Sequence, residues 1–114
     1  MNDVEMWADR LRLVGNPIRL MVLLSLYSSN FMRKSDHSLR YSELQELIGT
    51  ANESGLNYHL RELEQAKVIS KEPTKDENGQ IYGLYHITPE GKKILEDLGL
   101  LKILNEQLRK LAGK

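Results

Sequence analysis

One stretch of the chain, residues 56–69 (LNYHLRELEQAKVI), constrains the fold more than any other. Within it, Leu56, Leu60 and Leu63 recur at spacings of three and four residues. That spacing places them on one narrow face of a helix with about 3.6 residues per turn. The sequence therefore predicts a helix that packs on a core through its leucines and leaves its other side free.

Two extended segments follow this helix. Residues 67–72 and 81–87 contain the Val, Ile and Tyr residues that favour strands. Between them, Asn78 and Gly79 can supply the positive backbone angles of a tight hairpin. A helix that runs directly into a hairpin is typical of a recognition helix followed by a wing, and we expect the wing to span residues 71–82.

The side of helix 53–66 opposite the leucines carries groups that donate and accept hydrogen bonds. Its members are Ser54, Asn57, Tyr58, Arg61 and Gln65. A mixture of hydroxyl, amide, phenol and guanidinium suits base edges and phosphates, whereas a face that is only solvated usually carries Lys and Glu. We expect this face to enter the major groove of double-stranded DNA.

Arg61 has two interpretations. It could pair bidentately with guanine, which contributes about 1 to 3 kcal/mol of discrimination between bases, or clamp a phosphate. It could instead form an intrahelical pair with Glu64 or Gln65, worth about 0.2 to 0.5 kcal/mol. Tyr58 likewise either contacts a phosphate or thymine, or covers the wing.

Cations outside the helix are further candidates for phosphate contacts. Arg40 precedes the helical pair, and Lys71 and Lys75 lie along the wing. Phosphate contacts require charge more than a particular placement, but solvated surface charge explains these residues nearly as well. At the wing tip, Asp76 and Glu77 would repel phosphate.

Composition sets limits on the partners and the chemistry. In 114 residues, sixteen Lys and Arg balance sixteen Asp and Glu, so the chain as a whole has no attraction for a polyanion and any basic surface must be local. The absence of cysteine excludes disulfides and thiolate chemistry, and the three histidines are too widely spaced to predict a metal site. No catalytic constellation or cofactor motif is recognisable, so we expect neither an enzyme nor a cofactor.

Hydropathy bears on localisation. The first residues, MNDVEMWADR, lack the basic flank and apolar run of a secretory signal, and the longest apolar run is far too short to span a membrane. We expect a soluble, cytoplasmic protein with no membrane partner.

Two helices are predicted near the N-terminus. Apolar residues in the segment 4–14, including Trp7 and Leu11, recur at helical spacing and give a short amphipathic helix. Asn16 and Pro17 then supply the cap and first-turn proline of a second helix. Because the sequence IRLMVLLSLY that follows is apolar nearly all round, this second helix should be the buried centre of the fold.

A helix-turn-helix is expected next. Residues 29–38 are polar and predict a loop, and residues 39–41 predict a short strand. The following helix should open at Ser42, with Gln45 completing a capping box, and end at Gly49. The link from there to the recognition helix is so short that the two helices must cross steeply.

The last segment predicts a helix that begins with a cap at Thr88 and Pro89. Farther along, leucines recur at spacings of three and four residues and can pack either on their own domain or on a second copy of the chain. They are Leu101, Leu104, Leu108 and Leu111. A helix beyond a complete core has little intramolecular surface left, so we expect a homodimer formed by these leucines together with Trp7 and Leu11.

We therefore divide the chain into a winged helix region, residues 1–98, and a dimerisation helix, residues 99–114. Gly99 lies where the helix can bend or break.

Four motifs resemble those of the winged helix regulators of the arsenic-repressor type and their relatives in the multiple-antibiotic-resistance group. Residues 16–19 look like the opening P-x-R helix of that family, residues 57–60 stand where it has S-x-H-L, and residues 64–69 are similar to its L-x-x-A-G-L-V ending. The segment I-T-P-E-G at residues 87–91 matches as well.

This resemblance implies a winged helix-turn-helix, mainly α with a small β-hairpin wing, in a prokaryotic homodimer that binds double-stranded DNA. It also implies that Asn57, Tyr58 and Arg61 face the major groove and that His59 flanks the core or reaches a phosphate. The chain departs from the pattern where Lys67 replaces a glycine and Asn57 a serine. Because it has no cysteine, thiolate metal sensing is excluded.

The sequence is thus interpreted as a homodimeric DNA-binding regulator of transcription. One alternative is a winged helix that serves protein–protein contact in a transcription complex or other assembly, which the zero net charge and acidic wing tip favour. Another is a small-ligand-responsive regulator with a pocket at the dimer interface.

Overall fold

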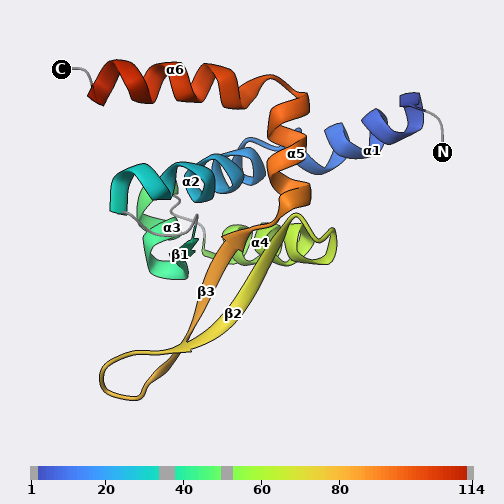
Figure 1. Cartoon of the computed structure of the whole chain (residues 1–114). Coiled ribbons are helices and arrows are strands. Elements are labelled where there is room, and N and C mark those ends of the chain that lie inside the picture. Colours follow the sequence, from blue (N-terminus) through green and yellow to red (C-terminus); the bar gives the residue numbers. More distant parts are fainter. Residues whose placement is uncertain (1–2, 34–37, 50–52, 113–114) are drawn as a thin grey trace.

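The computed structural model describes residues 3–33, 38–49 and 53–112 (Figure 1). In this part of the chain, the helices gather at one end of a small antiparallel sheet, and the long hairpin of the sheet extends away from them. The elements in order are α1 (Asp3–Val14), α2 (Pro17–Arg33), β1 (Ser38–Arg40), α3 (Tyr41–Ile48), α4 (Glu53–Gln65), β2 (Ile69–Lys75), β3 (Ile81–Ile87), α5 (Pro89–Asp97) and α6 (Leu100–Ala112). The predicted fold class, mainly α with a β-hairpin wing, is confirmed.

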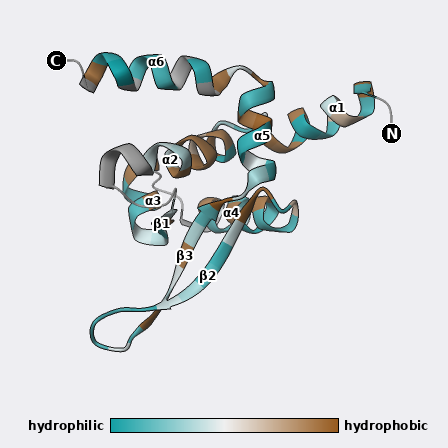
Figure 2. Ribbon diagram, in the orientation of Figure 1, coloured by the Kyte–Doolittle hydropathy of each residue, from teal (hydrophilic) through white to brown (hydrophobic). Residues whose placement is uncertain are grey.

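Helix α2 forms the centre of the core, as predicted. Its Val22, Leu23 and Leu26 are fully buried, and Figure 2 shows apolar residues gathered along this helix. The helix begins where Asn16 Oδ1 accepts hydrogen bonds from the backbone nitrogens of Ile18 (2.8 Å) and Arg19 (3.4 Å). The Asn–Pro pair therefore acts as the cap that the sequence indicated.

The loop predicted from residue 29 onward is wrong in its first part, because α2 continues to Arg33. The serines that indicated a break are accommodated within the helix. Ser28 Oγ donates to the Ser25 carbonyl (3.3 Å) and Ser29 Oγ to the Leu26 carbonyl (2.7 Å). A serine that bonds to the preceding turn hides its polar group and lets the helix continue. Residues 34–37 lie outside the described part.

The N-cap of α3 lies two residues earlier than predicted, at Arg40 rather than at Ser42. The strand β1 ends at Arg40, one residue short of the predicted strand, and Arg40 is the N-cap. Its backbone N–H donates to Glu43 Oε1 (2.9 Å), so Glu43 and not Gln45 closes the helix start. The helix ends at Gly49, whose left-handed φ of 65° matches the prediction. The link at residues 50–52 lies outside the described residues.

Helix α4 packs as the leucine spacing predicted, with Leu56, Leu60 and Leu63 all buried. It ends in a Schellman turn in which Val68 N donates to the Leu63 carbonyl (3.2 Å) and Lys67 N to the Glu64 carbonyl (3.0 Å). Lys67 occupies the left-handed position of that turn, with φ of 63°. This is the position that usually holds glycine, so the departure from the family pattern leaves the turn geometry unchanged.

The sheet has the strand order β1-β3-β2, with both pairings antiparallel. Strand β3 matches its predicted range, whereas β2 starts at Ile69 and continues to Lys75. The prediction of positive backbone angles at both Asn78 and Gly79 is wrong for Asn78: residues 76–80 form the loop between the strands, closed by a bond from Asp76 N to the Gln80 carbonyl (2.9 Å). Only Gly79 in this loop has positive φ (78°), because the Asp76 carboxylate orders the remaining backbone.

The C-terminal helices meet at Gly99, whose φ of 76° breaks the chain into α5 and α6. Helix α5 is capped as predicted, because Thr88 Oγ1 accepts from Gly91 N (3.2 Å) and Pro89 is the first helical residue. Helix α6 lies on the side of the molecule away from the hairpin (Figure 1). No helix among the described residues combines the length and apolarity needed to cross a membrane.

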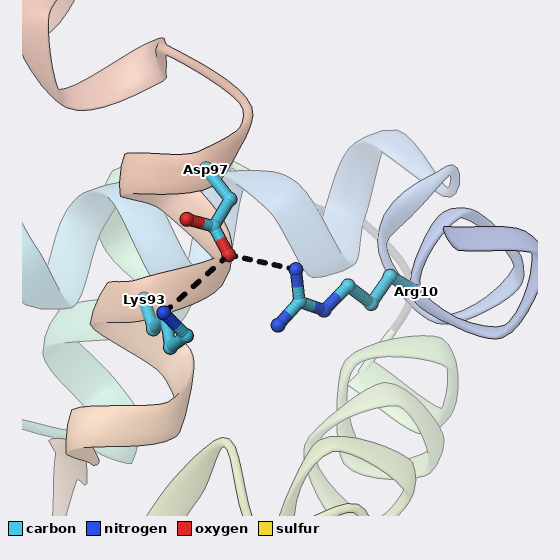
Figure 3. A network of polar contacts seen from close by, with 3 residues as sticks. All are labelled: Arg10, Lys93 and Asp97. Carbon is cyan, nitrogen blue, oxygen red and sulfur yellow. Dashed lines mark hydrogen bonds and ion pairs between the residues drawn. The ribbon is translucent and has the colours of Figure 1, made fainter. Parts of the chain in front are cut away.

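An ion pair joins the first helix, α1, to α5. Arg10 on α1 donates from Nη1 to Asp97 Oδ2 on α5 (2.8 Å), and Lys93 Nζ lies 4.0 Å from the same oxygen (Figure 3). Arg10 also lies over the Trp7 ring, with its guanidinium carbon 5.0 Å from the ring centroid. These contacts connect α1 to α5.

Candidate nucleic-acid interface

The face of α4 opposite its buried leucines is exposed to solvent. Asn57, Tyr58, Arg61 and Gln65 are exposed, and Tyr58 as a whole residue retains 47% of its accessible surface. Ser54 belongs to the first turn of the same helix, but its side chain lies outside what the structure describes. The leucines on the inner side fix the rotation of α4, so these polar groups face outward as a consequence of the core.

Arg61 is available for an external partner. Within the residues that the structure describes, the Arg61 guanidinium forms no ion pair with Glu64 and no hydrogen bond with Gln65. The intrahelical interpretation of this arginine is therefore not the one that the structure adopts.

A cleft of about 460 Å³ separates α4 from the wing and is lined in part by Asn57, Arg61 and Lys71. The Lys71 stem crosses Gly83, where a Cβ atom would come within 2.4 Å of Lys71 Cε. Its ammonium ends 5.5 Å from the Tyr85 ring centroid. Glycine at position 83 thus lets a cation lie flat on the sheet and face the helix.

One acid also reaches this cleft. Glu64 lies among its lining residues, so the local basic surface includes one carboxylate. With Arg61 and Lys71 on the two walls, the cleft still carries more positive than negative charge.

Arg40 lies on the other face of the sheet. It pairs in register with Leu84, which in turn pairs with Glu72, whereas Lys71 pairs with Tyr85. Adjacent residues of a strand point to opposite faces, so Arg40 and Lys71 cannot share one surface. The guanidinium carbon of Arg40 instead lies 3.8 Å from the Tyr82 ring centroid, a cation–π contact that the sequence did not suggest.

The wing tip is acidic but partly self-satisfied. Asp76 Oδ1 accepts from the backbone nitrogens of Asn78 (2.9 Å) and Gln80 (2.8 Å). Glu77 is exposed, as is Lys75 at the end of β2. Asp76 therefore has a structural role in the loop, and Glu77 is the acid that faces solvent.

Behind the exposed face, His59 points inward and contacts Arg19, a residue that the sequence did not single out as part of the site. Arg19 Nε donates to His59 Nδ1 (2.9 Å), and the pKa of His59 is lowered by burial and by the charge of Arg19, against a smaller opposing effect of Glu62. The prediction that His59 flanks the core is consistent with this geometry. The only sequence signal for the contact is that Arg19 and His59 belong to two of the four recognised motifs.

The residues predicted for dimer contact lie on α1 and α6. Leu11 is 53% exposed and Leu111 68% exposed, while Trp7 is half-buried beneath Arg10. Trp7 and Leu11 line an apolar hollow on α1 together with Val4, which is also exposed. Leu101, Leu104 and Leu108 lie on α6, but their side chains are outside the described part of the structure.

A larger hollow, of about 730 Å³, lies between α1, α4 and α5 within one chain. Its lining combines apolar residues with charges of both signs. The apolar residues are Leu13, Ala66, Val68 and Ile94, and the charged residues include Arg19, Glu62 and Lys93. Across the described segments, no three His, Cys, Asp or Glu side chains gather as metal ligands would, and His37 lies outside those segments.

Comparison with known proteins adds a family and a fold. The model of the family described as a domain of unknown function (DUF7347) matches residues 8–98. No curated protein matches the chain.

Several solved structures share the fold. A candidate MarR-family transcriptional regulator from Enterococcus faecalis V583 is similar with a TM-score of 0.69 at 18% identity, over 99% of this chain and 94% of that one. A candidate MarR-family regulator from Porphyromonas gingivalis W83 gives 0.67 at 17% identity, over 93% and 94%. Diamide-treated YodB from B. subtilis gives 0.66 at 18% identity, over 94% of each chain. At such identities the likeness establishes the winged helix-turn-helix fold.

Proposed function

This chain belongs to the DUF7347 family, and we propose that it is a homodimeric regulator of transcription that binds specific sites in double-stranded DNA. The observation that carries the proposal is the bare polar face of α4, held outward by buried leucines on the opposite side. The winged helix fold and its similarity to structures described as transcriptional regulators support it.

In this proposal, α4 enters the major groove. Asn57 and Arg61 read base edges, since an amide matches adenine and a guanidinium matches guanine, each pairing contributing about 1 to 3 kcal/mol of discrimination. Ser54, Tyr58 and Gln65 contact the flanking backbone or bases. The absence of an intrahelical partner for Arg61 among the described residues favours this role.

Phosphate contacts come from the base of the wing rather than from its tip. Lys71 faces α4 across the cleft, so a phosphate at the groove edge can lie between Lys71 and Arg61. Lys75 extends the same edge strand, whereas Glu77 disfavours a phosphate at the tip. Arg40, on the opposite face and stacked on Tyr82, contacts DNA only where the duplex passes that side of the wing.

We further propose that α1 and α6 form a two-fold interface. Leu11 and Leu111 are exposed, and further leucines continue the apolar stripe along α6. Each leucine side chain that the interface buries fully would contribute roughly 1.5 to 3 kcal/mol. Residues 1–98 then form the DNA-binding region and residues 99–114 the dimerisation helix, separated at the Gly99 break. A two-fold pair would recognise a palindrome with half-sites about 34 Å apart.

The alternative with specific support is a protein-contact module. The zero net charge and the exposed Glu77 both weaken attraction to a polyanion and suit a partner protein. A ligand-responsive regulator is the third possibility, and the hollow between α1, α4 and α5 would serve it within one chain rather than at the dimer interface.

The deciding experiment measures binding of the full chain to duplexes selected from random DNA, by fluorescence anisotropy at low and high salt. DNA binding through phosphates requires affinity to fall steeply as salt rises. Arg61→Ala should weaken binding to the selected site about tenfold or more, whereas Arg12→Ala, which removes an exposed arginine of α1, should not. No detectable binding even at low salt would instead favour the protein-contact module.

A further inference from the structure

One side chain connects three helices next to the proposed DNA-binding face. Arg19, in the first turn of α2, donates from Nε to His59 Nδ1 on α4 (2.9 Å) and from Nη1 to the Leu13 carbonyl on α1 (3.2 Å). Its guanidinium carbon also lies 5.7 Å from the centroid of the Tyr58 ring. Arg19 is therefore a contact shared by α1, α2 and α4.

The α1 end of this contact uses a carbonyl that the helix leaves open. Leu13 lies in the last turn of α1, where the carbonyls have no intrahelical partner. The planar guanidinium presents donors in fixed directions, so the bond to Leu13 and the bond to His59 set each other's geometry. A lysine at this position has one nitrogen and cannot reproduce this fork.

At the α4 end, the bond to His59 adds a polar contact to the rotation that the buried leucines already set. Successive residues of a helix are about 100° apart, so fixing the direction of His59 also fixes those of Tyr58 and Arg61. The Tyr58 and His59 rings meet edge to face, with centroids 5.3 Å apart, which ties the exposed phenol to the anchored imidazole. Displacing Arg19 would remove the hydrogen bond to the imidazole and the cation–π contact with the phenol.

We propose that Arg19 is a positioning residue that locks the recognition helix to the end of α1, so that a displacement of α1 is transmitted to Tyr58 and Arg61 on the DNA-binding face. This inference rests on the proposed function for its DNA readout, but the contact itself is independent of DNA. Exposed apolar residues of α1 are proposed for the dimer interface. The Arg19 contact therefore links the pairing of two chains to the position of α4 on the DNA-binding face.

The contact between Arg19 and His59, which we call the lock, depends on the protonation state of His59. Only an imidazole with an unprotonated Nδ1 accepts from Arg19, because the imidazolium has two donors and no acceptor. The charged groups that face His59 are Arg19 from α2 and Glu62 from its own helix, one turn away. Of these, Arg19 opposes protonation and Glu62 favours it.

Three substitutions test the lock. Arg19→Lys keeps the charge but removes the fork, and His59→Leu removes the acceptor; each should weaken binding to the selected duplex about tenfold. His59→Asn retains an oxygen near the position of Nδ1 and should restore binding to within about twofold of the wild type. Binding by the wild type should weaken as the pH falls below 6.5, the ordinary pKa of histidine, and through the lowered pKa of His59, whereas binding by His59→Asn should not follow that pH profile.

Nitrogen NMR of the imidazole tests the contact without DNA. In the wild type, neutral His59 should be held as the Nε2–H tautomer with Nδ1 accepting, and Arg19→Lys should shift it toward a mixture of tautomers. Unchanged tautomers, or Arg19→Lys affinity equal to wild type, would overturn the lock. If wild-type protein binds no duplex, the proposed function fails, whereas the imidazole spectrum still decides whether Arg19 holds His59.

Discussion

Gly91 lies so close to Val68 that a Cβ atom on the glycine would stand 2.3 Å from the Val68 carbonyl oxygen. The same oxygen accepts a hydrogen bond from Thr88 N (3.1 Å), and Thr88 Oγ1 donates to the Lys67 carbonyl (2.7 Å). The segment I-T-P-E-G thus fastens the start of α5 to the turn that follows α4. Two of the four motifs recognised in the sequence meet at this point.

Gly91→Ala should lower the free energy of unfolding by roughly 1 to 3 kcal/mol, since the methyl group would meet backbone that cannot move aside. Denaturant unfolding measures the change. Gly83→Ala is the matched control, because its nearest neighbour is the flexible end of Lys71. Equal losses in the two variants would contradict the assigned cause.

Lys67→Gly should stabilise the protein by about 0.5 to 1 kcal/mol, because a lysine at φ of 63° carries steric strain that glycine does not. Lys67→Ala removes the charge but retains the Cβ atom, so it should show no such gain. Thermal or denaturant unfolding of the three proteins separates strain from charge. A gain shared by both variants would assign the effect to charge instead.

The pH dependence of stability should include a contribution from His59. Burial, and then the charge of Arg19, lower its pKa below the ordinary 6.5. The unfolded chain therefore binds the proton more readily, so this contribution is complete above pH 6.5 and is lost as the pH falls through the folded pKa. Denaturant unfolding between pH 8 and about pH 5 should show a smaller decline for His59→Asn than for the wild type. Parallel curves would refute the assignment.

Glu77→Gln should raise the affinity for duplex DNA about twofold at low salt, because Glu77 is the exposed acid of the wing tip. The gain should vanish at high salt, where surface charges are screened. Glu106→Gln makes the same charge change on α6, away from the wing, and should leave the affinity unaltered. A comparable gain in that control would point to net charge rather than to the wing.

Leu11→Asn should weaken self-association without unfolding the chain, because this leucine is exposed in the single chain. Sedimentation velocity over a concentration series measures the shift toward monomer. Arg12→Asn changes the neighbouring exposed position and should leave the assembly intact. If Leu11→Asn assembles as the wild type does, α1 is not the interface.

Elements whose signals are local were predictable from the sequence. The leucine face of α4, the Asn16 cap, the left-handed Gly49 and the Thr88 cap each depend on residues within a few positions of one another. The errors arose where a side chain bonded to backbone in a way that residue type does not specify. The Ser29 hydroxyl, for example, donates to the Leu26 carbonyl in the preceding turn, so the serine lies within α2 and does not end it.

The site was harder to predict than the fold, because its arrangement depends on distant pairings. Arg19 and His59 are separated by 40 residues, and nothing local to either indicates their contact. Arg40 and Lys71 were grouped by charge alone, and only the strand register shows that they lie on opposite faces. Periodicity predicts which face of an element is free but not which free faces adjoin.

Because α6 follows the turn at Gly99, a small change in the backbone angles of this glycine would move the far end of the helix by a larger distance. A helix of 13 residues is about 20 Å long, so a rotation of roughly 10° at this glycine would carry the far tip through about 3 Å. In the described structure, no atom of a non-neighbouring residue lies within 4 Å of the place where a Cβ atom would stand on Gly99. If two chains pair through α6 as proposed, the φ and ψ angles of Gly99 would set the distance between their two α4 helices.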